Sequence, residues 1–263
     1  MLGKLLKYDL KWIYKVIGVF YILAFIFSVL GRALSKIENS VVFSVISQIT
    51  FGFAISMMVS SLINCLMRLW VRFIRNLYKD ESYLTHTLPV EKKTVYASKV
   101  ICALVCILTT TIVIIACLFI CYYSEANIEI LKTVLELTAS TYNTTVINLL
   151  LLVAFVIFLE LIFIVLIGYA GIILGHKSNQ NKMIKTIVIG FIIYLAMQIL
   201  TLCGICVCGI FNKDIMNLVK TTDVINIDTI KSMLYIGIGI YVIYIAFLYI
   251  LGKKQLEKGV NVE

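Results

Sequence analysis

The sequence predicts an all-α membrane protein with six transmembrane helices, because it is very apolar and its apolar runs are long. Hydrophobic residues make up 62% of the 263 residues and charged residues 14%, with a mean hydropathy of +1.04. About 20 apolar helical residues cross the hydrocarbon core, where backbone groups must bond within the chain. Six continuous runs are long enough: Trp12–Leu34, Val41–Met67, Val100–Tyr123, Thr145–Gly175, Thr186–Phe211 and Ser232–Leu251. We therefore treat residues 1–263 as a single transmembrane domain.

The first 15 residues, MLGKLLKYDLKWIYK, have an amphipathic pattern. Lysines recur on one helical face and aliphatic residues on the other: Lys4, Lys7, Lys11 and Lys15 against Leu2, Leu6, Leu10 and Ile13. This pattern predicts a helix over residues 1–15 that lies in the cytoplasmic membrane interface. Asp9 falls within the apolar face. Either its carboxylate reaches headgroup water, or it pairs with a basic residue near the end of another span, such as Arg68 or Arg72.

The placement of basic residues predicts that both termini are cytoplasmic. Of the 23 Lys and Arg residues, six fall on the opposite side of the predicted spans: Arg32, Lys36, Lys132, Lys213, Lys220 and Lys231. The other 17 lie on the side that carries both termini, and an excess of Lys and Arg marks the cytoplasmic side. The net charge of +9 is then a topology signal, and no nucleic-acid partner is expected.

The cysteines do not indicate a metal site. All eight lie within predicted spans, and Cys203-Gly-Ile-Cys206-Val-Cys208 has no His or carboxylate nearby to complete a ligand set. We interpret them as small packing residues. The outer loops, about 35–40, 124–144 and 212–231, are too short for an extracellular domain.

The longest cytoplasmic segment, residues 68–99, carries the most specific pattern. Arg68, Arg72 and Arg75 follow the second span at helical spacing, so that helix should continue into the cytosol. Asp80 and Glu81 favour a new helix start at about 80–87, because carboxylates stabilise the free amides of a first turn. This short helix would present Tyr83, Leu84 and Thr87 to the cytosol. Pro89, the only proline, ends it and suits the first position of the next helix, with Glu91 in its first turn.

This segment resembles a known family. Tyr78-Lys79-Asp80-Glu81-Ser82-Tyr83-Leu84, then Thr87-Leu88-Pro89-Val90, then Ser98-Lys99 are similar to residues of small ABC exporter permeases of the second type from Gram-positive bacteria. Glu91 departs from the small polar residue usual after Leu-Pro-Val. These permeases have six spans, an N-terminal elbow helix and a short coupling helix between spans two and three. The specific part of the resemblance covers residues 72–99.

The resemblance implies a function in a bacterial cell membrane. A coupling helix docks on a separate ATP-binding cassette subunit, present in two copies, while two permeases, as a homodimer or related heterodimer, form the pathway. The docking contacts would be Asp80, Glu81, Tyr83, Leu84, His86 and Thr87. His86 has the alternative of a solvated surface histidine. This chain has no Gly-x-x-x-x-Gly-Lys-Ser/Thr motif, so it is not itself an enzyme, needs no cofactor, and ATP and Mg²⁺ would bind the partner.

The resemblance also suggests a cargo of amphipathic peptides, antimicrobial or cytolytic, such as phenol-soluble modulins or lantibiotics. The alternatives are a drug or lipid exporter permease, or a membrane immunity protein that acts without an ATPase. An intramembrane metalloenzyme is disfavoured, because the only histidines are His86 and His176 and no His-Glu-x-x-His motif occurs. A secondary transporter is disfavoured by the lack of a clear internal repeat or proline-broken span.

A second set of candidate residues lies near the membrane midplane. Glu160 is the only acidic residue deep within a predicted span, and Gln198 and Thr109–Thr111, centred on Thr110, lie at similar depth. An intramembrane carboxylate suggests a pathway or an interface, and its alternative is a protonated side chain that bonds to a neighbouring helix. Gly171 and Gly175, spaced as small-xxx-small, indicate close helix packing.

Overall fold

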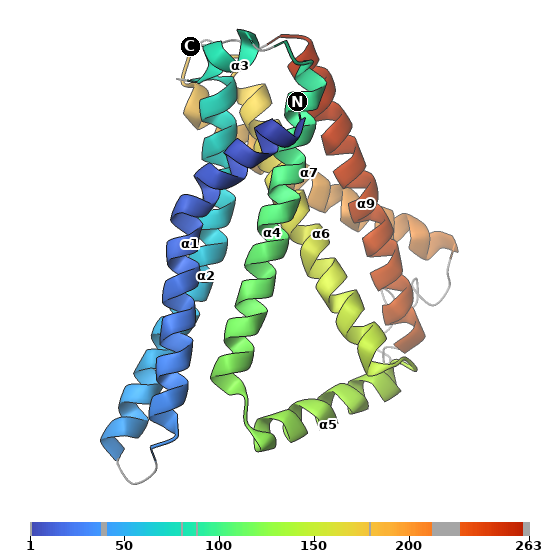
Figure 1. Cartoon of the computed structure of the whole chain (residues 1–263). Coiled ribbons are helices and arrows are strands. Elements are labelled where there is room, and N and C mark those ends of the chain that lie inside the picture. Colours follow the sequence, from blue (N-terminus) through green and yellow to red (C-terminus); the bar gives the residue numbers. More distant parts are fainter. Residues whose placement is uncertain are drawn as a thin grey trace. The chain divides into compact units, whose positions relative to one another are not determined.

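The computed structural model describes residues 2–37, 41–79, 81–87, 89–178, 180–211 and 227–259, apart from the side chains of His86, Phe211 and Asp228. Over these residues the fold consists of eight α-helices and no strand, which confirms the predicted all-α architecture (Figure 1). Six of the helices in this described part of the chain are long and apolar enough to cross a membrane. The chain forms two compact units, Met1–Ile130 and Leu131–Asn261, and each is described by itself.

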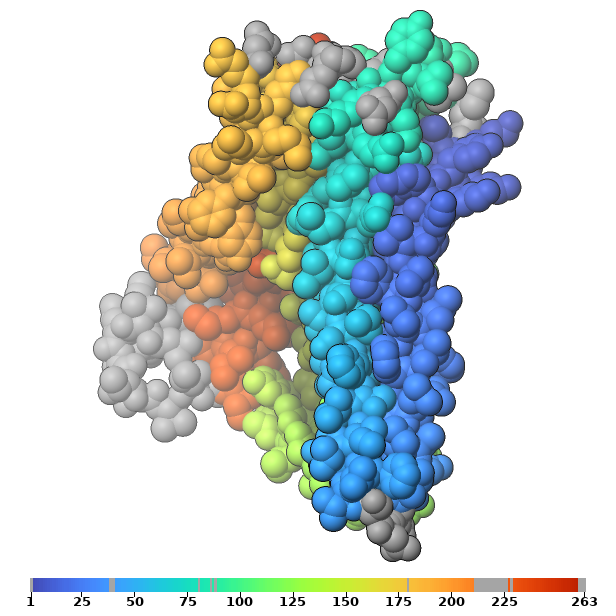
Figure 2. Space-filling model, turned by 90° about the vertical axis from the view of Figure 1, so that its left-hand side faces the viewer, coloured from blue at the N-terminus to red at the C-terminus, as the bar shows by residue number. Residues whose placement is uncertain are grey.

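The first unit is built from α1 (Leu2–Ser35), α2 (Val41–Leu77), α3 (Ser82–Thr87) and α4 (Lys92–Tyr122). In the space-filling view α1, in blue, lies against α2, in cyan, along most of its length (Figure 2). Helix α4 packs on both (Figure 1). One part of the core consists of small or flexible side chains that allow close approach: Ala24, Ala54, Met58, Cys117 and Cys121. The five cysteines of this unit are buried, in agreement with their interpretation as packing residues, whereas Cys203 and Cys206 of the second unit are exposed and Cys208 is partly exposed.

Helix α1 joins the amphipathic segment to the first span without a break. Its first turns are inclined to the rest of the helix (Figure 1). The buried residues of α1 recur mainly every three or four positions and form one stripe: Asp9, Ile13, Ile17, Ala24, Ser28 and Gly31. This helical periodicity carries Asp9 into the interior.

The second unit contains α6 (Val146–Gly175), α7 (Lys182–Phe211) and α9 (Ile227–Glu257). Helices α6 and α7 pack closely at glycines. A Cβ atom built on Gly171 would lie 3.0 Å from the Gly190 Cα, and one built on Gly175 would lie 2.6 Å from the Thr186 Cα. The small-xxx-small interpretation as packing is therefore confirmed.

One predicted loop is a helix. Residues 124–144 were expected to be an outer loop, but they contain α5 (Glu125–Thr141), which follows α4 after two residues. Its charged residues recur every three or four positions, which is a helical pattern: Glu125, Glu129, Lys132 and Glu136. The segment was assigned as a loop because its hydropathy is too low for a membrane span. Most of the 212–231 loop lies outside the described residues.

Candidate functional site: a buried charge cluster beside a short exposed helix

The segment after α2 folds back on the last turns of that helix. The amides of Tyr78 and Lys79 donate to the Ile74 carbonyl, and the Glu81 amide donates to the Arg75 carbonyl at 3.2 Å. Tyr78 is buried at this bend, and its burial raises the pKa of its phenol. These bonds set α3 directly against the end of α2, which continues past the three arginines as predicted.

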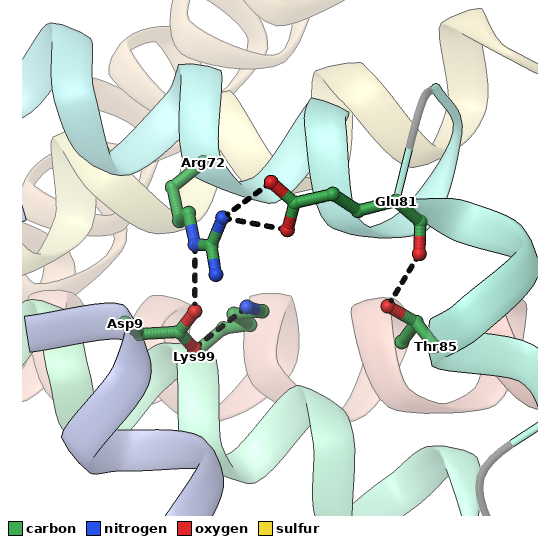
Figure 3. Close-up of polar contacts among 5 residues, drawn as sticks. All are labelled: Asp9, Arg72, Glu81, Thr85 and Lys99. Carbon is green, nitrogen blue, oxygen red and sulfur yellow. Dashed lines mark hydrogen bonds and ion pairs between the residues drawn. The ribbon is translucent and has the colours of Figure 1, made fainter. Parts of the chain in front are cut away.

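Arg72 joins α1 to the residue that precedes α3. Its Nε donates to Asp9 Oδ1 at 2.8 Å, and its Nη1 donates to both Glu81 carboxylate oxygens at 2.9 and 2.7 Å. Figure 3 shows the guanidinium between the two carboxylates. A planar guanidinium suits this arrangement because it offers several donors in fixed directions.

Lys99 completes the balance of charge around Asp9. Its Nζ donates to Asp9 Oδ2 at 2.6 Å, so the two carboxylate oxygens bond to cations from two different helices. Only 2% of Asp9 and 4% of Lys99 is exposed. Two anions and two cations therefore form a neutral cluster, which we call the charge cluster: Asp9, Arg72, Glu81 and Lys99. Neutrality matters because an unpaired buried charge costs several kcal/mol.

The structure thus shows an ion pair for Asp9, and Arg72 is one of the two partners named from the sequence. Lys99 was not predicted as a partner of Asp9. Lys99 directly precedes the apolar run that begins at Val100, and this position at the end of a span could have indicated a partner for Asp9. It was interpreted only as one of the basic residues that flank the spans. The Glu81 carboxylate was also expected to stabilise the free amides in the first turn of the short helix. It bonds to Arg72, while its carbonyl accepts from the Thr85 amide and hydroxyl at 3.0 and 2.9 Å.

An aromatic side chain covers the arginines beside the cluster. The Cζ atoms of Arg68, Arg72 and Arg75 lie 5.1, 5.3 and 5.8 Å from the Trp12 ring centroid. Such cation–π contacts stabilise guanidinium groups that are partly removed from water. Trp12 was not singled out from the sequence, although its place on α1 near Asp9 was a signal.

Helix α3 presents an apolar surface outward. Tyr83 is 76% exposed and Leu84 is 67% exposed, and Thr87 is exposed as well. Asp80 lies outside the described residues, and nothing is described of the His86 side chain. Because large apolar side chains are seldom left in water side by side, this pair marks a surface suited to contact with another molecule.

Pro89 does not begin the next helix. It is exposed within the connector, while Glu91 is the N-cap of α4, with φ −62° and ψ 137°, and α4 starts at Lys92. The expected position of Pro89 in the first turn was therefore wrong. The Thr94 and Val95 amides bond to the Glu91 carbonyl, and the first helical residue, Lys92, lies three residues beyond the proline.

The midplane candidates divide between the two units. In the second unit, the Tyr241 hydroxyl interacts with the side chains of both Glu160 and Gln198. The rings of Tyr241 and Phe163 meet at 5.0 Å between centroids. The sequence predicts similar depths for Glu160 and Gln198, but it does not indicate Tyr241, whose hydroxyl lies beside the Glu160 carboxyl group.

Thr110 belongs to the first unit, where it has partners on α1 and α4. Its Oγ1 lies 2.6 Å from the Tyr21 hydroxyl and donates to the Cys106 carbonyl at 2.7 Å. Thr109 makes a matching contact at 2.6 Å with the Tyr14 hydroxyl. These contacts make Thr110 part of the α1–α4 packing. Among the described residues, no group of three or more His, Cys, Asp or Glu side chains could hold a metal ion.

Comparisons with protein-family models, curated proteins and solved structures found no match to this chain.

Proposed function

We propose that this chain is the membrane-spanning permease subunit of an ATP-driven exporter of the ABC class. Three features support the proposal: six helices long enough to span a membrane, the motif over residues 72–99, and a short helix after the second span with an exposed apolar surface. The exposed Tyr83–Leu84 pair on α3 is the strongest support, because it offers a separate ATP-binding subunit an apolar surface to bind.

The charge cluster gives this surface a mechanical connection. A force on α3 reaches Glu81, then Arg72, and through Asp9 it reaches α1 and Lys99 on α4. Movement of a docked ATP-binding subunit would therefore act on three helices of the first unit together. ATP and Mg²⁺ bind to that partner in this proposal, and two copies of it serve two permeases. The cargo we propose is an amphipathic peptide, which could enter from the cytoplasm or the inner leaflet.

The first experiment asks whether an ATP-binding subunit accompanies this chain. The chain is purified from native membranes, and the associated proteins are tested for ATPase activity after reconstitution in liposomes. We expect an ATP-binding subunit at one copy per permease, with activity that a subset of amphipathic peptides stimulates. Export or immunity without an associated ATPase would contradict the proposal and favour an immunity protein acting alone.

The second experiment tests the docking surface. Tyr83→Glu with Leu84→Glu should abolish copurification of the ATP-binding subunit, because two carboxylates cannot be buried against an apolar groove without a large desolvation cost. Tyr8→Glu is the matched control, since Tyr8 is also a large exposed side chain of the first unit, located on α1. Normal copurification of the double variant, with intact folding by size-exclusion chromatography, would refute docking through α3.

A further inference from the structure

Helix α5 has a separation of charged and apolar residues that the proposed function does not use. Its four charged residues, at 125, 129, 132 and 136, share one face and are all exposed. The opposite face is apolar and exposed too: Ile130 at 64%, Leu131 at 58%, Val134 at 54% and Leu137 at 69%. An apolar face this exposed marks a contact with a membrane or with another protein, and the helices on either side of α5 indicate which of the two it is.

The two adjoining helices hold α5 at a membrane surface. Both α4 and α6 are long and apolar enough to span, so α5 lies where the first leaves the membrane and the second enters it. Only residues 123–124 separate α4 from α5, and only residues 142–145 separate α5 from α6. Four extended residues reach about 14 Å at most, so neither end of α5 can move far from the membrane boundary.

Local bonds strengthen the connection between α4 and α5. The Ser124 hydroxyl accepts from the Asn127 amide at 3.1 Å, and the Asn127 side chain donates to the Tyr122 carbonyl at 3.0 Å. The chain therefore turns sharply from α4 into α5 (Figure 1). Tyr122 and Tyr123 are both about half exposed at this turn. Tyrosine is enriched at the level of the lipid headgroups, where its ring is in apolar surroundings and its hydroxyl is wet.

We propose that α5 is an interfacial helix that lies in the bilayer surface on the face of the membrane opposite α3. Its apolar face, Ile130, Leu131, Val134 and Leu137, enters the boundary between headgroups and acyl chains, and its charged face points to water. This inference rests on the membrane-spanning helices and stands independently of any ATP-binding partner.

The charges on α5 also indicate the kind of lipid contact. Three carboxylates and one lysine give the charged face a net negative charge, and Lys132 pairs with Glu136 at 3.8 Å. Attraction to anionic headgroups therefore does not hold α5 at the surface, in contrast to the lysine-rich face of α1. Burial of the apolar face drives the contact, so depth should not depend on the fraction of anionic lipid.

The test is nitroxide scanning of the full chain in liposomes. Single cysteines replace Val134 or Leu137 on the apolar face, and Lys132 or Glu136 on the charged face. The background carries Cys203→Ala, Cys206→Ala and Cys208→Ala, because the other five cysteines are buried. Accessibility is measured to oxygen, which concentrates in lipid, and to a neutral nickel chelate, which stays in water.

We expect oxygen to dominate at positions 134 and 137, and the nickel chelate to dominate at 132 and 136. The ratio at each position should be unchanged when anionic phosphatidylglycerol is raised in a phosphatidylcholine membrane. High nickel accessibility on both faces would mean that α5 stands in water and would overturn the proposal. Low accessibility to both reagents at 134 and 137 would overturn it as well, because a protein would then cover this face.

Discussion

Arg72 is the residue on which the arrangement of the first unit depends most directly. It touches a carboxylate on α1 and a carboxylate beside α3, and it lies under the Trp12 ring. The amphipathic pattern was enough to mark Asp9 as anomalous and to name Arg72 as a candidate partner. The pattern could not identify Lys99, because pairing across 90 residues depends on how the helices pack.

Asp9→Asn should destabilise the protein strongly, since it leaves one net positive charge within the cluster. Loss of one partner of a buried ion pair costs about 3–5 kcal/mol. The measurement is thermal unfolding in detergent, and Glu136→Gln on the exposed face of α5 is the control, with little change expected. Lys99→Met added to Asp9→Asn should restore part of the loss because it restores neutrality. No recovery in the double variant would argue against a charge-balance role.

Arg72→Lys should loosen α3 while it keeps the charge. An ammonium is a compact donor, so it cannot reproduce the planar contacts to both carboxylates. We expect faster hydrogen exchange of the amides in residues 82–87, with Arg68→Lys as the control because Arg68 also lies over Trp12. Equal exchange rates in the two variants would show that Glu81 does not depend on the guanidinium.

Hydropathy was sufficient to predict the helices that are long and apolar enough to span a membrane. It failed to predict helices in segments where polar residues lower the mean hydropathy. All six apolar runs are helices, but most extend beyond the predicted ends, as α9 does by six residues to Glu257. In α5 four charges masked a helix whose periodicity was present in the sequence. Pro89 was misplaced because proline favours a first helical turn without requiring one. The backbone bonds around Glu91 decide the start of α4.

The α6–α7 contact gives a prediction at this scale. Gly175→Ala should lower the melting temperature, because its Cβ would overlap the Thr186 backbone and such overpacking costs about 1–3 kcal/mol. Gly190→Ala is the matched control on the partner helix, since a Cβ there meets nothing within 4 Å. An equal effect of the two substitutions would show that helix propensity, rather than close approach, explains these glycines.

For the whole molecule, the sequence establishes a multi-pass helical protein and predicts its orientation from the distribution of Lys and Arg. Neither hydropathy nor charge predicts that the chain divides into two units within α5, at Ile130 and Leu131. That division depends on which helices pack together, and packing partners are set by contacts between residues far apart in the sequence.

The orientation is open to direct measurement. Tyr83→Cys on α3 should react with a membrane-impermeant maleimide only in inverted vesicles, and Lys132→Cys on α5 only in intact cells. The excess of Lys and Arg on the α3 side predicts this outcome. The three-alanine background limits labelling of native cysteines, and detergent should make both positions reactive. Labelling of Tyr83→Cys in intact cells would reverse the assigned orientation.

The charge cluster has a consequence for the order in which the protein is made. Asp9 is synthesised 63 residues before Arg72 and 90 residues before Lys99. While α1 is the only span complete, its carboxylate has neither of these cations, and a carboxylate without them is costly to bury. Asp9 can therefore settle into its final place only after the ribosome has delivered the start of the third span.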